Sequence, residues 1–73
     1  MSRGNYINPK VVRDAMQQLE TFKEQSESKT PLFDFAKNQP ESERAIYVRA
    51  AQRLKWNVTR SKGHVYENGF FIW

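Results

Sequence analysis

The side chains that could do chemistry in this sequence are mostly basic, and they lie close together. Residues 44–66 hold six Lys or Arg and no Asp or Glu, whereas residues 1–43 hold six basic against seven acidic residues. The net charge of +4 therefore arises in one stretch of the chain. A localised basic surface attracts polyanions, above all nucleic acids, and it excludes the acidic class of small inhibitor that imitates DNA.

Catalysis and metal binding have few residues to use. The chain has one histidine, His64, no cysteine and no glycine-rich phosphate loop, which removes the common nucleophilic, metal-binding and nucleotide-binding arrangements. Glu41 and Glu43 lie at an expected helix start, where carboxylates usually stabilise the helix dipole. We therefore expect no enzymatic activity, no metal site and no cofactor.

A basic helix is the main candidate for binding. An apolar line at helical spacing predicts this helix from residue 40 to about residue 55. The line is formed by Tyr47, Ala50, Ala51 and Leu54. On the opposite side Arg49 and Arg53 lie one turn apart with Gln52 between them, and these side chains can contact base edges as well as phosphates.

The segment after this helix adds further basic residues. Residues 56–60 have strand composition, and alternation places Val58 and Arg60 on the same side. Lys62-Gly63 allows a turn or a bulge. The residues expected to bind nucleic acid are Arg44, Arg49, Gln52, Arg53, Lys55, Arg60, Lys62 and His64.

The aromatic end of the chain predicts a β-hairpin. Asn68-Gly69 is typical of a type I′ turn and would join residues 64–67 to residues 70–73. Alternation places Phe70 and Ile72 on one face and Phe71 and Trp73 on the other. Both faces cannot pack on the same helices, so one pair is either covered by other aromatic residues, Phe33 and Phe35, or left for a partner. The candidate protein-contact residues are Tyr66, Phe71 and Trp73.

The first half of the chain predicts supporting helices. Asn8-Pro9 is a helix start signal, and an apolar stripe follows it over residues 9–26. Thr30-Pro31 repeats the signal. Residues 32–36 are compatible with a short helix or a strand, and the preceding cap favours the helix.

These elements predict a single α+β domain over residues 1–73. It would comprise a flexible arm at residues 1–7, a helical part at residues 8–55 and a β-hairpin or wing at residues 56–73. Two or three helices followed by a C-terminal β-hairpin is the layout of a winged helix-turn-helix. In that architecture the last helix enters the major groove and the wing contacts the flanking backbone.

The end of the chain also carries a resemblance. The run VRAAQRLKWNVTR at residues 48–60, followed by Asn68-Gly69 and the ending FIW, resembles small bacteriophage-encoded proteins of winged-helix type. Those proteins share a basic helix, a V-[ST]-x-R strand, a glycine turn and a closing V-W. The resemblance covers about the last thirty residues. It implies a winged-helix fold and a phage context; this chain departs from the pattern at Trp56 and in its longer hairpin.

We therefore expect a small basic regulatory or accessory protein that binds nucleic acid, DNA in preference to RNA, without catalysing a reaction. The alternative is a non-enzymatic module that binds a host protein and inhibits or redirects it. No apolar run approaches the length of a membrane span, so we expect a cytoplasmic protein without a membrane partner, in the host bacterial cytosol if it is phage-encoded. The sequence leaves the target site and the oligomeric state open.

Overall fold

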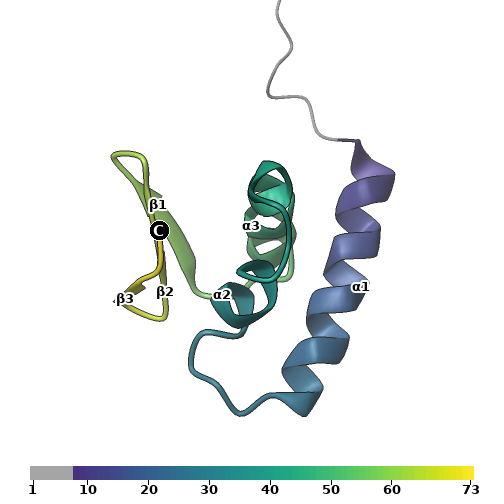
Figure 1. Ribbon diagram of the computed structural model, residues 1–73, viewed down its shortest axis with the longest axis horizontal. Helices are drawn as coiled ribbons and strands as arrows, with labels where there is room; N and C mark the ends of the chain where they lie inside the picture. The colour runs from purple at the N-terminus through teal and green to yellow at the C-terminus, as the bar shows by residue number, and fades with distance from the viewer. Residues whose placement is uncertain (1–7) are drawn as a thin grey trace, which may run out of the picture.

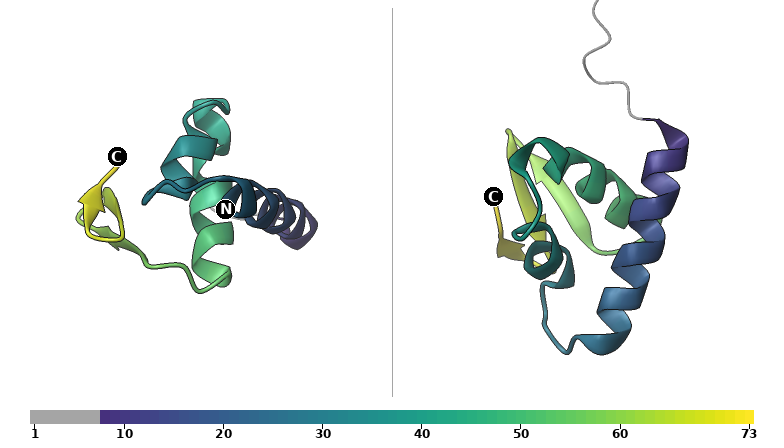
Figure 2. Two further views of the ribbon diagram at one scale, coloured as in Figure 1. Left: turned by 90° about the horizontal axis from the view of Figure 1, so that it is seen from below. Right: turned by 45° about the vertical axis from the view of Figure 1, so that its right-hand side comes forward.

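The computed structural model describes residues 8–73 and confirms the α+β class. Three helices precede a three-stranded antiparallel sheet in that part of the chain (Figure 1). The elements are α1 (Pro9–Gln25), α2 (Pro31–Ala36), a 3-10 turn η1 (Glu41–Glu43), α3 (Arg44–Arg53), β1 (Val58–Ser61), β2 (His64–Glu67) and β3 (Phe70–Phe71). Helix α3 lies between α1 and the sheet (Figure 2, left). The arm expected at residues 1–7 lies outside the described residues.

Helix α1 begins and ends close to the predicted bounds. The side chain of Asn8 accepts a hydrogen bond from the Lys10 backbone N–H at 2.8 Å, and Pro9 takes the first helical position. The helix buries Val12, Ala15 and Leu19. These three residues form the apolar stripe that packs α1 against α3.

The segment that the sequence left open between helix and strand is helix α2. Thr30 precedes it but makes no side-chain capping bond. The cap comes instead from β2, where the Glu67 carboxylate accepts hydrogen bonds from the backbone N–H groups of Leu32 and Phe33 at 2.8 and 3.1 Å. A residue distant in sequence therefore supplies the acceptor that a helix start needs.

Helix α3 is shorter than predicted at both ends. Its expected first turn is the 3-10 turn η1, and it ends at Arg53. The end is a Schellman motif, because the Trp56 N–H donates to the Ala51 carbonyl and the Lys55 N–H to the Gln52 carbonyl. Lys55 has a φ of 69° in this motif, a conformation more often taken by glycine.

The predicted hairpin is the second half of a three-stranded meander with the order β1-β2-β3. Lys62 and Gly63 have φ values of 52° and 83°, and Asn68 and Gly69 have values of 53° and 86°. Both two-residue turns thus have the two positive φ angles of a type I′ hairpin. The Asn68-Gly69 turn is confirmed, and the Lys62-Gly63 segment is a turn that brings a third strand into the sheet.

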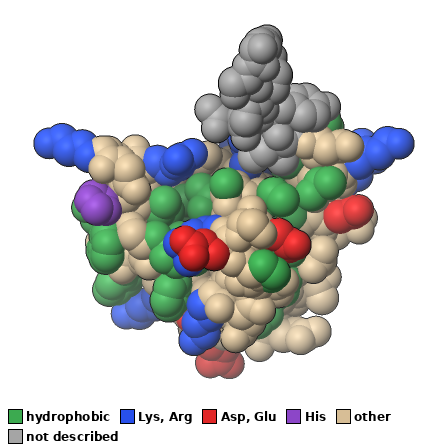
Figure 3. Space-filling model, turned by 45° about the horizontal axis from the view of Figure 1, so that its top comes forward, with side chains coloured by type: hydrophobic (Ala, Val, Ile, Leu, Met, Phe, Trp, Pro, Cys, Tyr) green, Lys and Arg blue, Asp and Glu red, His purple; other side chains and the backbone are tan. Residues whose placement is uncertain are grey.

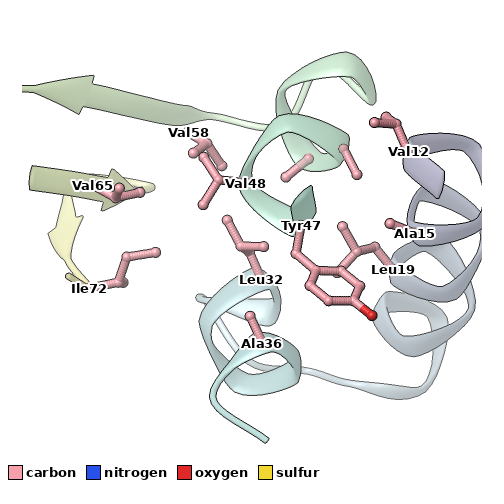
Figure 4. Packing of buried hydrophobic residues seen from close by; sticks show 12 residues of the cluster. Val12, Ala15, Leu19, Leu32, Ala36, Tyr47, Val48, Val58, Val65 and Ile72 are labelled. Carbon is pink, nitrogen blue, oxygen red and sulfur yellow. The ribbon is translucent and has the colours of Figure 1, made fainter. Parts of the chain in front are cut away.

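The core lies between the sheet and the helices (Figure 4). Val58 and Val65 of the sheet face Val48 of α3 and Leu32 of α2, and Tyr47 and Leu19 fill the space toward α1. The inner face of the sheet is thus the face that carries Val58 and Val65.

The alternation expected for the four C-terminal aromatic and apolar residues holds for Phe70, Phe71 and Ile72, because Phe70 lies opposite inward-facing Glu67 and Phe71 opposite Tyr66, but it is wrong for Trp73. Ile72 is buried and Trp73 half-buried with its ring 5.6 Å from that of Phe33, whereas Phe70 and Phe71 are both exposed. The N–H groups of Ile72 and Trp73 both donate to the Val65 carbonyl. This is a β-bulge, which breaks strict alternation and lets two successive residues turn toward the core.

Candidate nucleic-acid interface

The solvent-facing side of α3 carries the three residues singled out in the sequence. Arg49, Gln52 and Arg53 are exposed, and the opposite side of the helix is buried. The buried residues are Tyr47, Val48, Ala50 and Ala51. Because the apolar side is packed against α1 and the sheet, the basic side is fixed in its outward orientation.

Strand β1 adds Arg60 on the same side of the sheet as the helices. Arg60 lies opposite Val65 in the β1–β2 register, and directly opposed residues share a face of an antiparallel pair. Val65 is buried on the inner face, so the exposed Arg60 side chain projects from that face beyond the core. We call the set Arg49, Gln52, Arg53 and Arg60 the basic surface.

Lys55 and Lys62 extend the positive charge at two turns. Both are exposed, Lys55 at the end of α3 and Lys62 at the β1–β2 turn. Figure 1 shows this turn at the upper left, away from α2, and Figure 3 shows Lys and Arg side chains projecting around hydrophobic ones. Both lysines therefore present their ammonium groups to solvent.

Arg44 differs from the other basic candidates because its guanidinium is engaged within the molecule. It lies 4.7 Å from the centroid of the Trp73 ring, and it is 4.0 Å from the Glu41 carboxylate. This is the one ion pair within 4.0 Å among residues 8–73. Arg44 thus covers Trp73, while the exposed cations of the basic surface have no carboxylate partner in the described part of the chain.

His64 lies on the other face of the sheet, away from the basic surface. Its ring is 5.5 Å from that of Phe71, and the Phe71 ring is 5.6 Å from that of Tyr66. In the strand register Thr59 lies opposite Tyr66 and Ser61 opposite His64. We call the set Thr59, Ser61, His64, Tyr66 and Phe71 the outer sheet face.

The candidate protein-contact residues are therefore separated. Tyr66 and Phe71 lie on the outer sheet face, and Phe71 is 60 % exposed. Trp73 is packed between Phe33 and Arg44. The hydroxyl residues Thr59 and Ser61 were not singled out in the sequence. Strict alternation along β1 would nevertheless have placed them on the other face of the strand from Val58 and Arg60.

Glu67 is the buried charged group that sequence reasoning missed. It is 1 % exposed, on the inner face with Val65. Burial raises the pKa of its carboxyl above the ordinary value, and the two backbone hydrogen bonds from α2 partly oppose that rise. Beside it lies a hollow of about 100 Å³ bordered by Lys23, Trp56 and Asn68. Alternation along β2 could have predicted this inward orientation, since it places Glu67 on the same face as Val65.

Metal-binding clusters and membrane-spanning helices are both absent from residues 8–73. No cluster of three or more His, Asp or Glu side chains there has an arrangement that would hold a metal ion. No helix among residues 8–73 combines the length and apolar character that crossing a membrane requires.

The chain belongs by its architecture to the α+β proteins with three helices and a C-terminal antiparallel sheet. Comparison with protein-family models, with curated proteins and with solved structures finds no match for it. What the protein does must therefore be inferred from its own side chains and their geometry.

Proposed function

We propose that this protein is a small DNA-binding regulator or accessory protein of winged-helix type. Helix α3 enters the major groove with Arg49, Gln52 and Arg53, and the β1–β2 hairpin follows the flanking backbone with Arg60 and Lys62. The protein carries out no chemistry of its own. The resemblance of residues 48–60 to phage-encoded winged-helix proteins supports a role in the cytosol of a bacterial host.

The observation that carries this proposal is the unpaired charge of the basic surface. Arg49, Arg53 and Arg60 are exposed, and no described carboxylate lies within 4.0 Å of them. Exposed arginines without acidic neighbours form a field that attracts phosphates, and binding releases the counterions condensed on DNA. The guanidinium groups on α3 are one helical turn apart, which suits contacts to neighbouring base edges or phosphates.

The test is fluorescence anisotropy with a labelled mixed-sequence duplex at low and near-physiological salt. Wild-type protein should bind at low salt and lose affinity steeply as salt rises. The double variant Arg49→Ala/Arg53→Ala should lose about 1–3 kcal/mol for each side chain that reaches a base edge. Side chains that reach only phosphate should each lower the salt slope by about 1 and weaken all sequences equally.

The matched control removes the same charge from another helix. Lys10 and Arg13 are exposed on α1, one turn apart, so Lys10→Ala/Arg13→Ala lowers the net charge equally. This control should keep most of the duplex affinity. Equal losses in both double variants would reduce the proposal to non-specific attraction, and no binding at low salt by folded protein would refute it.

A protein partner is the second candidate function, and the exposed aromatic residues favour it. Phe70 and Phe71 are 50 % and 60 % exposed, which is unusual for large apolar side chains in neighbouring positions. On this alternative a host protein would be bound and inhibited or redirected through these exposed rings at the end of the sheet. Capture of one host protein from lysate, abolished by Phe70→Ala/Phe71→Ala and retained by Arg49→Ala/Arg53→Ala, would support it.

A further inference from the structure

The outer sheet face combines exposed aromatic rings with hydroxyl groups and has no carboxylate. Thr59 and Ser61 come from β1, His64 and Tyr66 from β2, and Phe71 from β3. Glu67, the acidic residue of these three strands, points to the inner face and is buried. Lys62 lies at the turn that joins β1 to β2. The face is therefore neutral to positive and offers both flat apolar surfaces and hydrogen-bond donors.

The Phe71 ring is held in place by its two aromatic neighbours. Its centroid lies 5.5 Å from that of His64 with an interplanar angle of 64°, and 5.6 Å from that of Tyr66 with an angle of 68°. Both contacts are edge-to-face, a favourable geometry that limits rotation of the ring. A ring that is 60 % exposed but already oriented loses little conformational entropy when a planar ligand stacks on it.

We infer that the outer sheet face binds the bases of a single-stranded nucleic acid, with Phe71 as the stacking residue. Bases stack on exposed aromatic side chains of sheets, while nearby cations and hydroxyl groups contact the phosphates. Here Lys62 supplies the cation, and Thr59 and Ser61 supply the hydroxyl groups. This inference rests on the proposed function, because Lys62 would contact the backbone of the same nucleic acid that the basic surface binds.

The size of the face favours bases over a protein partner. Strands β1 and β2 have four residues each and are roughly 14 Å long, β3 has two, and three neighbouring strands span roughly 10 Å, so the face measures at most about 140 Å². A stable protein interface buries about 800 Å² on each partner. A single base needs no more than one ring surface, and charge complementarity with phosphate is met by Lys62 and opposed by no carboxylate on this face.

The two surfaces together define the form of the nucleic acid. The basic surface lies on the helical side of the sheet and the outer sheet face on the other, with Lys62 at the turn between them. A ligand would contact both surfaces if its duplex part bound at α3 and its single-stranded part passed the β1–β2 turn to reach the outer sheet face. The substrate class is therefore nucleic acid in which unpaired bases adjoin a duplex.

The test measures binding of a labelled oligothymidylate strand and of the duplex used above. Phe71→Ala should weaken single-strand binding at least about fivefold, the lower end of the effect of removing one stacked base. Duplex binding should change less than about twofold. Phe71→Tyr should keep single-strand affinity, and Phe71→Leu, which preserves an apolar side chain in the strand, should lose it like Phe71→Ala.

Phe70 provides the matched control. It lies opposite Glu67 rather than Tyr66 and is also half-exposed, so Phe70→Ala removes a similar area from the other face of the same strand. Phe70→Ala should leave single-strand affinity unchanged. Equal loss in Phe70→Ala and Phe71→Ala, or full affinity in Phe71→Leu, would overturn the stacking role.

The outcomes for the two ligands separate this inference from the proposed function. Duplex binding without single-strand binding would overturn the inference and leave the proposed function standing. Single-strand binding that depends on Phe71, without duplex binding, would keep Phe71 as a stacking residue and would overturn both the proposed function and the assignment of a ligand that includes a duplex. Failure to bind either ligand, combined with Phe71-dependent capture of a protein, would overturn both in favour of the protein-binding alternative.

Discussion

The two turns of the sheet have nearly the same backbone and opposite surroundings. Lys62-Gly63 and Asn68-Gly69 are both two-residue turns with two positive φ angles. The β1–β2 turn carries Lys62 into solvent beside exposed Arg60 and His64. The β2–β3 turn is tied to the rest of the molecule, since the Asn68 side chain donates to the Lys29 carbonyl at 2.6 Å and Glu67 caps α2.

One end of this small sheet therefore attaches it to the helices, and the other end exposes basic side chains to solvent. The turn residues themselves only connect two strands, and they do so in the same way at both turns. The residues next to each turn determine whether it contacts the helices or the solvent. At one end the buried Glu67 carboxylate and the exposed Asn68 side chain are both hydrogen-bonded to the segment that leads into α2, which fixes the sheet on the helices. At the other end the polar groups remain free for a ligand. The comparison predicts that substitutions at the two turns affect different properties of the protein.

The largest effect is expected from Glu67→Ala. It leaves the Leu32 and Phe33 N–H groups without their acceptor at the start of α2, and we expect the free energy of unfolding to fall by about 1–3 kcal/mol. Urea unfolding followed by circular dichroism measures this loss. Arg60→Ala, near the other turn, should change stability by less than about 0.5 kcal/mol. Equal stabilities for both variants would remove the distinction between an anchored and a free turn.

Glu67, next to the β2–β3 turn, should also make the stability of the protein depend on pH. Because burial raises the pKa of Glu67 in the folded protein, the folded state retains a proton that the unfolded chain releases between the ordinary pKa of 4.5 and the raised value. The contribution of Glu67 is therefore most favourable below that window and falls as pH rises through the folded pKa. Urea unfolding of wild type and Glu67→Gln across this range should show wild type gaining relative to the variant as pH falls. A constant difference would contradict the assignment.

The smallest change in stability is expected from glycine substitutions at the two turns. Lys62→Gly relieves a left-handed conformation, and the Lys62 side chain makes no hydrogen bond within residues 8–73, so the substitution should raise stability by at most about 1 kcal/mol. It should also lower the salt slope of duplex binding by about 1. Asn68→Gly relieves a similar φ but loses the bond to the Lys29 carbonyl, so it should give no gain. Thermal unfolding of both variants tests whether their effects differ.

Local signals in the sequence predicted the elements well. Asn8-Pro9 marks the start of α1, Asn68-Gly69 forms its turn, and the apolar line of α3 turns Arg49 and Arg53 outward. Each signal depends on neighbours within one or two turns of the chain. Helical spacing and turn propensity are properties of such short segments, which is why they could be recognised without the structure.

Features that depend on distant partners could not be predicted in the same way. The bulge at Ile72 and Trp73 depends on where Val65 lies in the sheet, and it overrides the alternation expected there. The engagement of Arg44 by Trp73 joins residues far apart in sequence. The division of the basic candidates between two sheet faces required the register of β1 on β2. That register places His64, which the sequence grouped with the groove-binding residues, on the other face of the sheet from Arg60.

The cap that Glu67 places on α2 has a consequence for folding cooperativity. A six-residue helix is too short to persist by itself, since its nucleation is not repaid by so few hydrogen bonds. Helix α2 lacks a side-chain cap from Thr30 and receives one from β2. We therefore expect helix α2 to be marginal by itself and to depend on the packed sheet for its stability. Helix α2 and the sheet should consequently be lost together when the protein unfolds.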